Sequence, residues 1–295
     1  MEEFCLLACT VALLFIALIV QPVAFAKGKV EHYQITSKIL ADAGQPASRE
    51  LSVYLPEEYD TSEAAYSVFY LLHGWTGTNR TFLGQGYPHY GELIGEIYIN
   101  EIMDRLIKQQ LIRPMLVVLP DVKRSTPPVI PAYRDYLVEE IIPFVDTRYR
   151  TIPRRNARAI AGHSVGGNDA VLTACSRPDM FSLVGAYTAY YGRTPTKDIF
   201  QENDMGLFSL RFWIYVGTND QNTSIPFWNR SLVQVLEEMN LPHTYIEDDG
   251  THWNHIKQRL EESIVFFSEY LSPPVVSVEP NGKLATIWGR MKQAQ

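Results

Sequence analysis

The alternation of apolar and polar positions is clearest near the start of the chain, after its first 30 residues. Residues 31–39 and 49–55 both alternate, with Gly44 between the two segments. Alternation is typical of a strand with one buried face, because successive side chains of a strand point to opposite sides. The two segments therefore predict an antiparallel hairpin at the edge of a sheet.

The pattern then changes to short runs that are apolar on both faces. Such runs are typical of parallel strands covered by helices on both sides. They lie at residues 67–72, 115–119, 157–161, 183–187 and 212–216, and a final strand is expected at 243–247. Helical segments are predicted between and after them, at residues 92–110, 133–146, 168–176, 228–239 and 256–270. This alternation predicts an α/β fold with a doubly wound, mostly parallel sheet, in one domain over residues 27–271.

The first 26 residues differ from the rest of the chain. Residues 4–20 are continuously apolar, Pro22 interrupts the run, and Ala24 and Ala26 are small residues at the positions that a signal peptidase reads. The segment is therefore interpreted as a signal peptide, which predicts a secreted or periplasmic protein. Acidic residues precede the apolar run where basic ones are usual, and the run is long. A membrane anchor that is not cleaved is the alternative.

Composition narrows the function classes. Hydrophobic residues make up 46% and charged residues 20% of the 295 residues, as in a globular enzyme. The formal net charge is −7 and no Lys/Arg run stands out, which argues against nucleic acid as a partner. After cleavage Cys175 is the only cysteine, so we expect no intrachain disulfide and a buried, unreactive thiol. No cluster of cysteine and histidine indicates a metal, and no cofactor is expected. Residues 272–295 form a C-terminal extension whose role the pattern does not indicate.

The most informative motif is Gly162-His163-Ser164-Val165-Gly166. A predicted strand precedes it and a predicted helix follows it. Strand, Gly-x-Ser-x-Gly and helix in this order are typical of the nucleophile elbow of α/β-hydrolases, in which a strained turn presents the serine. The motif predicts an α/β-hydrolase fold with Ser164 as nucleophile.

A serine nucleophile needs a base, and four histidines are candidates. His163 adjoins the serine, but we expect its side chain to point away at a tight turn. His243 opens the last strand at the wrong edge of the sheet, and His255 begins the next helix. His252 lies in a loop just past the carboxyl end of that strand, the edge at which open α/β sheets gather their chemistry. We therefore expect His252 to be the base.

The carboxylate that orients the base should follow the serine and precede the histidine. Asp220 meets this requirement, because it follows the strand at residues 212–216 through a short turn. Asp248 and Asp249 are the alternatives nearest to the histidine in sequence. The expected triad is Ser164, Asp220 and His252.

The tetrahedral intermediate of ester cleavage needs backbone donors. One should be the amide of Val165, directly after the nucleophile. The other should come from the loop after the strand at residues 67–72, where Gly74 allows the amides to turn inward and Trp75 is the expected donor. His73 in the same loop is expected to brace it from a buried position.

At these positions the chain resembles the putative-esterase (esterase D-like) group of α/β-hydrolases, over about residues 51–271. That group includes feruloyl and acetylxylan esterases, S-formylglutathione hydrolases, enterochelin esterases and mycolyltransferases. The resemblance rests on residues 70–74 (YLLHG), 118–121 (VLPD), 139–143 (EEIIP), 149–151 (YRT), 158–167 (RAIAGHSVGG), 217–220 (GTND) and 250–253 (GTHW). Members of the group commonly carry Leu or Phe at position 163 and Met at position 165, and neither difference removes a catalytic group.

The resemblance implies a serine esterase, a carboxylic-ester hydrolase that forms an acyl-enzyme. An acyltransferase with a sugar or alcohol acceptor is the alternative, because mycolyltransferases use the same triad. A binding protein on an inactive hydrolase scaffold would lack a triad member, and none is missing. The expected partner is a small-molecule or polysaccharide-linked ester, with no stable membrane association after signal cleavage.

The expected substrates are short-chain or aromatic esters. The segments that could cover the site, residues 76–91 and 188–211, are too short for a large lid, which predicts an open cleft. Aromatic residues near its rim could stack on a phenolic acyl group or a sugar, or could pack in the core. They are Tyr187, Tyr190, Tyr191, Trp228 and Trp253, of which Tyr190, Trp228 and Trp253 are the candidate substrate-binding residues.

Overall fold

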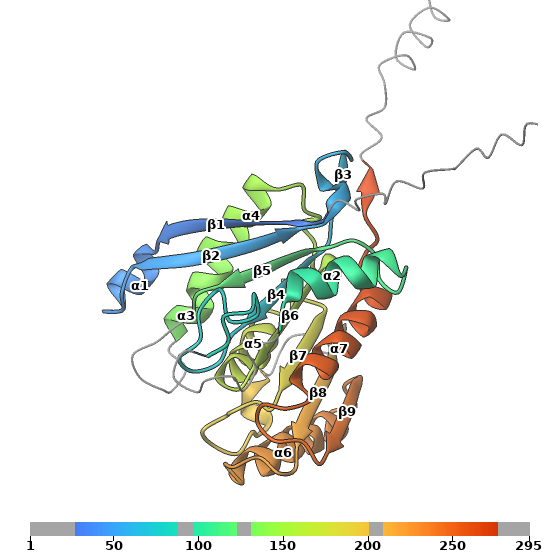
Figure 1. Ribbon diagram of the computed structural model, residues 1–295. Helices are drawn as coiled ribbons and strands as arrows, with labels where there is room; N and C mark the ends of the chain where they lie inside the picture. Colours follow the sequence, from blue (N-terminus) through green and yellow to red (C-terminus); the bar gives the residue numbers. More distant parts are fainter. Residues whose placement is uncertain (1–26, 88–96, 123–130, 201–208, 277–295) are drawn as a thin grey trace, which may run out of the picture.

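The computed structural model describes residues 27–87, 97–122, 131–200 and 209–276 (Figure 1). Within these ranges eight strands form one sheet, in the order β1-β2-β5-β4-β6-β7-β8-β9. Its strands are β1 (Lys29–Thr36), β2 (Ser48–Leu55), β4 (Val68–Leu72), β5 (Leu116–Pro120), β6 (Arg158–His163), β7 (Leu183–Tyr187), β8 (Arg211–Gly217) and β9 (His243–Asp248). Strand β2 runs antiparallel to β1 and β5, and the remaining pairs are parallel. The predicted α/β class and the N-terminal antiparallel pair are confirmed.

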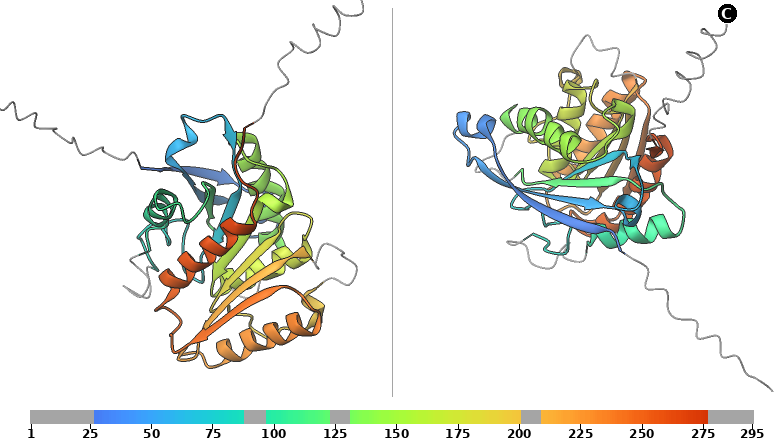
Figure 2. Two further views of the ribbon diagram at one scale, coloured as in Figure 1. Left: turned by 90° about the vertical axis from the view of Figure 1, so that its right-hand side faces the viewer. Right: turned by 90° about the horizontal axis from the view of Figure 1, so that it is seen from above.

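Helices cover both faces of the sheet (Figures 1 and 2). Helices α2 (Ile99–Lys108) and α7 (Ile256–Tyr270) pack on one face, and the others on the opposite face. Those others are α1 (Lys38–Asp42), α3 (Pro131–Asp135), α4 (Ile142–Arg148), α5 (Val165–Ser176) and α6 (Ser224–Glu238). Strand β4 shows why its sequence is apolar throughout: Tyr70 and Leu72 face one helix layer, whereas Phe69 and Leu71 face the other.

The connection inside the N-terminal hairpin differs from a simple turn. The first strand ends at Thr36, and Ser37 caps helix α1 by accepting a hydrogen bond from the Leu40 amide (3.0 Å). A serine at the N-cap favours a helix start, which explains why the alternating pattern up to residue 39 does not stay extended. Gly44 then returns the chain with a positive φ of 70°.

The helix predicted at residues 133–146 is longer and less regular than expected. It runs from α3 through a wide π-helical segment (Tyr136–Ile141) into α4. Pro143 near the start of α4 has no amide hydrogen to donate to the preceding turn, and this disturbs the regular pattern of hydrogen bonds there. Short 3₁₀ turns lie at Glu57–Tyr59, Arg155–Ala157 and Lys197–Ile199.

The last described residues return to the beginning of the parallel strands. Strand β10 (Val275–Val276) pairs antiparallel with β3 (Ala64–Ala65), just before β4. The Ser67 hydroxyl also donates to the Ser272 carbonyl (2.6 Å). The start of the C-terminal extension is therefore part of the folded unit, and residues 277–295 lie outside the described residues.

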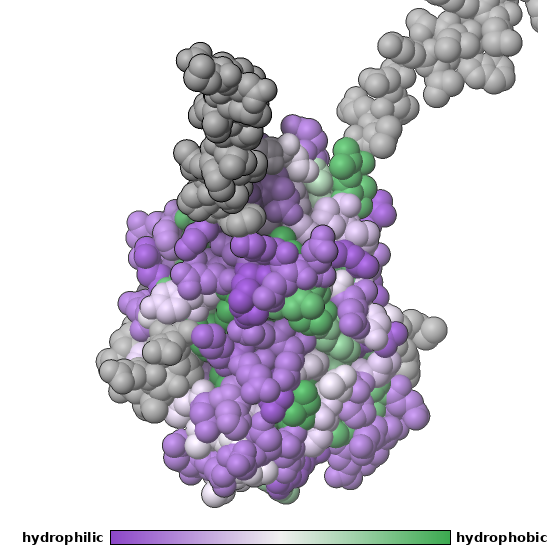
Figure 3. All heavy atoms as spheres, turned by 45° about the vertical axis from the view of Figure 1, so that its right-hand side comes forward, coloured by the Kyte–Doolittle hydropathy of each residue, from purple (hydrophilic) through white to green (hydrophobic). Residues whose placement is uncertain are grey.

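Several predictions fall wholly or partly outside the described ranges. The predicted signal peptide, residues 88–91 and 201–208 of the two cover segments, and residues 92–96 of a predicted helix are among them. None of the helices that the structure does describe is long and apolar enough to cross a bilayer. On the face shown in Figure 3, the described residues are mainly hydrophilic, and hydrophobic ones occupy small areas between them.

Candidate active site

The turn that carries Ser164 is strained. Ser164 joins β6 to α5 with φ 56° and ψ −122°, a conformation that residues with a side chain rarely adopt. Such a backbone costs about 1–3 kcal/mol and persists only where its surroundings enforce it. The Ser164 amide donates to Tyr187 (2.9 Å), and its carbonyl accepts from Gly167 (3.0 Å) and Tyr190 (3.0 Å). The predicted elbow geometry is therefore present.

Only glycine fits at the first and last positions of the motif, because the neighbouring backbone leaves no room for a side chain. A Cβ on Gly162 would lie 2.3 Å from the carbonyl oxygen of Gly166. A Cβ on Gly166 would lie 2.4 Å from the carbonyl oxygen of His73. Both distances are below any real carbon–oxygen contact, so the elbow and the loop after β4 can approach only through glycine.

The loop after β4 brings Trp75, one of the two expected oxyanion donors, to the cavity that contains the serine. A Cβ on Gly74 would lie 3.0 Å from the Cβ of Ser164, so the backbone of this loop runs directly past the nucleophile. Trp75 and Val165 line the same cavity as Ser164. His73 is buried, and the Val122 amide donates to its Nε2 (3.0 Å) while Nδ1 donates to the Gly74 carbonyl (2.8 Å). It braces the loop, as the sequence predicts.

The expected acid and base are joined by a short hydrogen bond. Nδ1 of His252 lies 2.6 Å from Oδ2 of Asp220, and both residues are buried. The other carboxylate oxygen of Asp220 accepts from the Asn222 amide (2.9 Å), which fixes its orientation. Because Nδ1 of His252 is bound to the carboxylate, Nε2 is the ring nitrogen left to exchange a proton with a substrate or nucleophile.

The loops that carry the acid and the base are attached to one another. The Thr218 amide donates to the Asp248 carbonyl (2.8 Å), and the Asn219 amide donates to the Gly250 carbonyl (2.9 Å). A Cβ on Gly217 would lie only 2.2 Å from that same Gly250 oxygen. The ends of β8 and β9 therefore place Asp220 and His252 as one unit.

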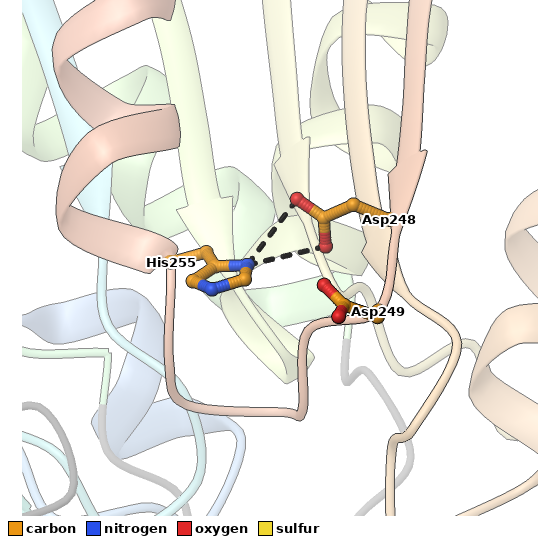
Figure 4. A group of neighbouring side chains, drawn as sticks. All are labelled: Asp248, Asp249 and His255. Atoms are coloured by element: carbon orange, nitrogen blue, oxygen red, sulfur yellow. Dashed lines mark hydrogen bonds and ion pairs between the residues drawn. The ribbon is translucent and has the colours of Figure 1, made fainter.

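Asp248, one of the two alternative acids, instead holds the base of the histidine loop. Burial raises the pKa of Asp248, but hydrogen bonds from Arg259, Gly250, His255 and Tyr215 outweigh it and lower the pKa to about 2. Figure 4 shows Asp248, Asp249 and His255 together, close enough for their ligand atoms to share a cation. The Arg259 guanidinium, 2.6 Å from Asp248, already neutralises that carboxylate. Asp248, held by Arg259 and His255, therefore braces the loop.

One cavity contains the expected residues. It has a volume of about 620 Å³ and is lined by Trp75, Tyr87, His163, Ser164, Val165, Tyr190, Asp220, Gln221, Asn222, Ile225, His252 and Trp253. Trp228 stands behind this wall and packs edge-on against Tyr190, with ring centroids 5.1 Å apart. Tyr187 and Tyr191, which could have lined the rim, are buried in the core. Cys175 is buried as expected, and burial raises the pKa of its thiol.

Two residues of this cavity were not expected there. The His163 ring does not leave the site but packs against His252, with ring centroids 4.7 Å apart. Tyr87 packs against both His163 and Trp253, at 5.6 and 5.4 Å. His163 adjoins the serine in the sequence, which was a signal that it belongs to the site. Nothing in the local sequence indicates that Tyr87 belongs to the site.

Comparisons with known proteins identify the family and the fold. The family model described as "Putative esterase" matches residues 45–255, more than half of the chain. A solved ferulic acid esterase superposes with a TM-score of 0.68 at 24% identity, covering 83% of this chain and 99% of the other. The ferulic acid esterase of Anaeromyces mucronatus gives 0.66 at 23% identity, covering 83% of this chain and 93% of the other.

A sequence relative is the endo-1,4-beta-xylanase/feruloyl esterase of Xylanibacter ruminicola. It is 33% identical over 145 residues, which cover 45% of this chain and 18% of the relative. The matched segment is thus a small part of a larger protein. The family match and the fold together confirm the resemblance seen in the sequence, and the chain belongs to the putative esterase family.

Proposed function

We propose that the protein is a serine carboxylic-ester hydrolase in which Ser164, His252 and Asp220 form the triad. The observation that carries the proposal is the 2.6 Å hydrogen bond between Asp220 and His252, in the cavity that also contains the strained Ser164. In this mechanism Nε2 of His252 takes the proton of Ser164 as its oxygen attacks the ester carbonyl. Asp220 holds the ring in the required tautomer and stabilises the imidazolium.

The remaining steps use backbone donors and water. The amides of Trp75 and Val165 stabilise the oxyanion of the tetrahedral intermediate. His252 then gives its proton to the leaving alcohol, and an acyl-enzyme on Ser164 remains. Water, activated by the same histidine, releases the acid and restores the serine.

We further propose short-chain and aromatic esters as substrates, free or attached to a polysaccharide. The apolar walls of the cavity include Trp75, Tyr190 and Trp253, and Trp228 supports Tyr190 from behind. Aromatic rings of this kind stack on planar acyl groups or on sugars. The likeness to solved ferulic acid esterases, one of them in complex with ferulic acid, supports the same substrate class.

The test is a panel of p-nitrophenyl acetate, butyrate and palmitate together with methyl ferulate. Acetate, butyrate or ferulate should be cleaved well and palmitate poorly. Ser164→Ala should abolish turnover, by roughly 10⁶-fold in comparable triads, and should remove labelling by a fluorophosphonate. Preference for palmitate would contradict the substrate class. Adding an alcohol acceptor tests the transferase alternative, since ester products exceeding hydrolysis would favour it.

We also propose that the protein is exported, with Lys27 as the first residue of the mature chain, because Ala24 and Ala26 occupy the positions before that bond. N-terminal sequencing of the protein from the culture medium or periplasm tests this. A start at Met1 in the membrane fraction would support the uncleaved anchor.

A further inference from the structure

A row of buried hydrogen bonds joins two loops of the site, and the proposed mechanism does not use it. The Gly74 amide donates to the Tyr87 hydroxyl (2.6 Å), which lies 2.9 Å from Nδ1 of His163. Nε2 of His163 lies 2.9 Å from the backbone carbonyl of His252. Tyr87 is 2% exposed and His163 is 0% exposed, so the loss of one partner would leave a buried polar group without its hydrogen bond, which is costly.

The two ends of this row fix its direction. The Gly74 amide can only donate and the His252 carbonyl can only accept. The Tyr87 hydroxyl therefore donates its proton to Nδ1 of His163, and the His163 proton sits on Nε2. Burial, with the neighbouring His252, holds the pKa of His163 well below its ordinary value, so the ring is neutral as this row requires.

The loops joined in this way come from distant parts of the sheet. Gly74 follows β4 and precedes Trp75, the proposed oxyanion donor. The His252 loop leaves β9, which lies three strands from β6 in the sheet (Figure 1). At about 4.8 Å per strand, the loop must reach about 14 Å sideways to bring its ring to the serine.

The loop has anchors at its base and at its tip. Asp248 holds the base through Arg259 (2.6 Å). At the tip, the His252 carbonyl accepts from His163 and, more weakly, from the Thr188 hydroxyl (3.4 Å). The bond to Asp220 fixes the ring of His252, whereas the bond from His163 fixes its backbone.

We propose that Tyr87 and His163 are positioning residues of the esterase. Through their hydrogen bonds they set the distance between the oxyanion loop and the catalytic histidine, so that both fit the same tetrahedral intermediate. The inference rests on the proposed function. Neither side chain exchanges a proton with the substrate, and their effect reaches the reaction through the backbones of Gly74 and His252.

The first test is Tyr87→Phe, which removes one oxygen and keeps the ring. Tyr136→Phe is the matched control, because Tyr136 is also buried and its hydroxyl makes no hydrogen bond with the described residues. On p-nitrophenyl acetate, Tyr87→Phe should lower kcat and the rate of fluorophosphonate labelling about 10-fold or more, since small displacements of reacting groups are costly. KM should stay within about 2-fold, and Tyr136→Phe should match the wild type in all three quantities.

The second test compares His163→Gln with His163→Phe. A glutamine can accept from Tyr87 with its carbonyl and donate to His252 with its amide, whereas a phenylalanine can do neither. We expect His163→Gln to recover most of the kcat that His163→Phe loses. Nitrogen NMR of the wild-type ring should show a proton on Nε2 and none on Nδ1 at neutral pH.

Three outcomes would overturn the proposal: equal kcat for Tyr87→Phe and Tyr136→Phe, a loss confined to KM, or a His163 ring protonated on Nδ1. If Tyr87→Phe does not fold, the proposal is tested by comparing His163→Gln with His163→Phe and by the tautomer of the His163 ring. Failure of the proposed function looks different. The wild type would then cleave no ester and react with no fluorophosphonate, whatever the tautomer of His163.

Discussion

The two halves of the site are held in place by different forces. On the nucleophile side, at the ends of β4 and β6, backbones touch at positions where only glycine fits, as at Gly162 and Gly166. On the acid–base side, at the ends of β8 and β9, backbones also touch at a glycine, Gly217, but side-chain hydrogen bonds and ion pairs are added to that contact, as between Asp220 and His252 or Asp248 and Arg259.

This difference follows from where each half lies in the sheet. The nucleophile side lies at the centre, where parallel strands in register fix the backbone, and Ser164 needs one rigid turn. The acid–base side includes the edge strand β9, so polar contacts hold its loop. Substitutions of the glycines on the nucleophile side should therefore act through steric overlap, and substitutions of the polar side chains on the acid–base side should act through charge and pH.

Among the three substitutions that compare the two sides, the largest effect is expected on the acid–base side, for Asp220→Asn. An amide in place of the carboxylate no longer holds His252 in the tautomer that leaves Nε2 free, so kcat should fall about 10⁴-fold. The melting temperature should change little, because the side chain keeps its shape. Ester hydrolysis and thermal unfolding measure the two effects.

Asp249→Asn is the control for that prediction. Asp249 is exposed and lies three residues from His252. Its turnover should equal that of the wild type. If Asp220→Asn were nearly as active as the wild type, the acid role would move to Asp248 or Asp249, and the contrast between the two sides would need revision.

An intermediate effect is expected on the nucleophile side, for Gly166→Ala. The added methyl group would overlap the backbone of the loop after β4, with His73 and Leu72 carbonyl oxygens at 2.4 and 2.6 Å. Overpacking of this kind costs about 3 kcal/mol of unfolding free energy when backbone atoms must move. Denaturant unfolding at two values of pH should give the same loss at both.

Gly44→Ala provides the comparison. Gly44 has a positive φ of 70°, unlike Gly166, and a Cβ there meets nothing within 4 Å. It should cost only about 1 kcal/mol, from backbone strain alone. Equal costs for the two substitutions would mean that the elbow relaxes easily, against the steric account.

The smallest effect is expected for Arg259→Gln at the base of the histidine loop. It should lower the free energy of unfolding by about 1 kcal/mol at neutral pH, a value between those of an exposed and a buried ion pair. Its dependence on pH is the sharper test. In the wild type the lowered pKa of Asp248 contributes stability that is present above about pH 4 and lost as the pH falls towards 2. The variant should show a smaller loss, because Gly250, His255 and Tyr215 still donate to Asp248, so the two stabilities should approach each other at low pH.

Arg230→Gln is the matched control. Arg230 on α6 pairs with Glu247, which precedes Asp248 in β9, but the Arg230 side chain is 53% exposed. We expect a smaller change there. A difference between wild type and Arg259→Gln that stayed constant from pH 6 to 2 would contradict the role of Asp248.

Much of this arrangement could be predicted from the sequence. An apolar run predicted a strand at residues 183–187 and the helical period predicted a helix at 256–270, which are the bounds of β7 and α7. The glycine pattern around Ser164 predicted the elbow. Chain order and the carboxyl edge of the sheet selected Asp220 and His252, which the structure brings within hydrogen-bond distance. These features depend on residues that are close together in the sequence, so the local pattern is enough to predict them.

The features that could not be predicted depend on contacts between distant segments. Tyr87 reaches His163 across 76 positions of the sequence, and no local pattern indicates such a contact. The His163 side chain was expected to point away from Ser164 because of the tight turn. The sequence of a turn does not indicate which distant side chains pack against it. Tyr187 reads as a rim residue at a strand end, but its hydroxyl is tied to Ser263 on α7 (2.6 Å) in the core. The cap at Ser37 is a local exception. Ser37 accepts from the Leu40 amide, and the alternating pattern did not indicate that this cap would end the first strand at Thr36.

The pairing of β10 with β3 determines how the molecule can be attached to a surface. Lys29 at the start of β1 and Val276 at the end of β10 both lie at the edge where the parallel strands begin, whereas the cavity lies where they end (Figure 1). An attachment through either end would therefore leave the cavity facing outward. If the proposed polymer-linked ester is the substrate, such an attachment would leave its approach to the cavity free. For the same reason, an affinity tag or a carrier domain fused next to Lys29 or Val276 is expected to leave the cavity accessible.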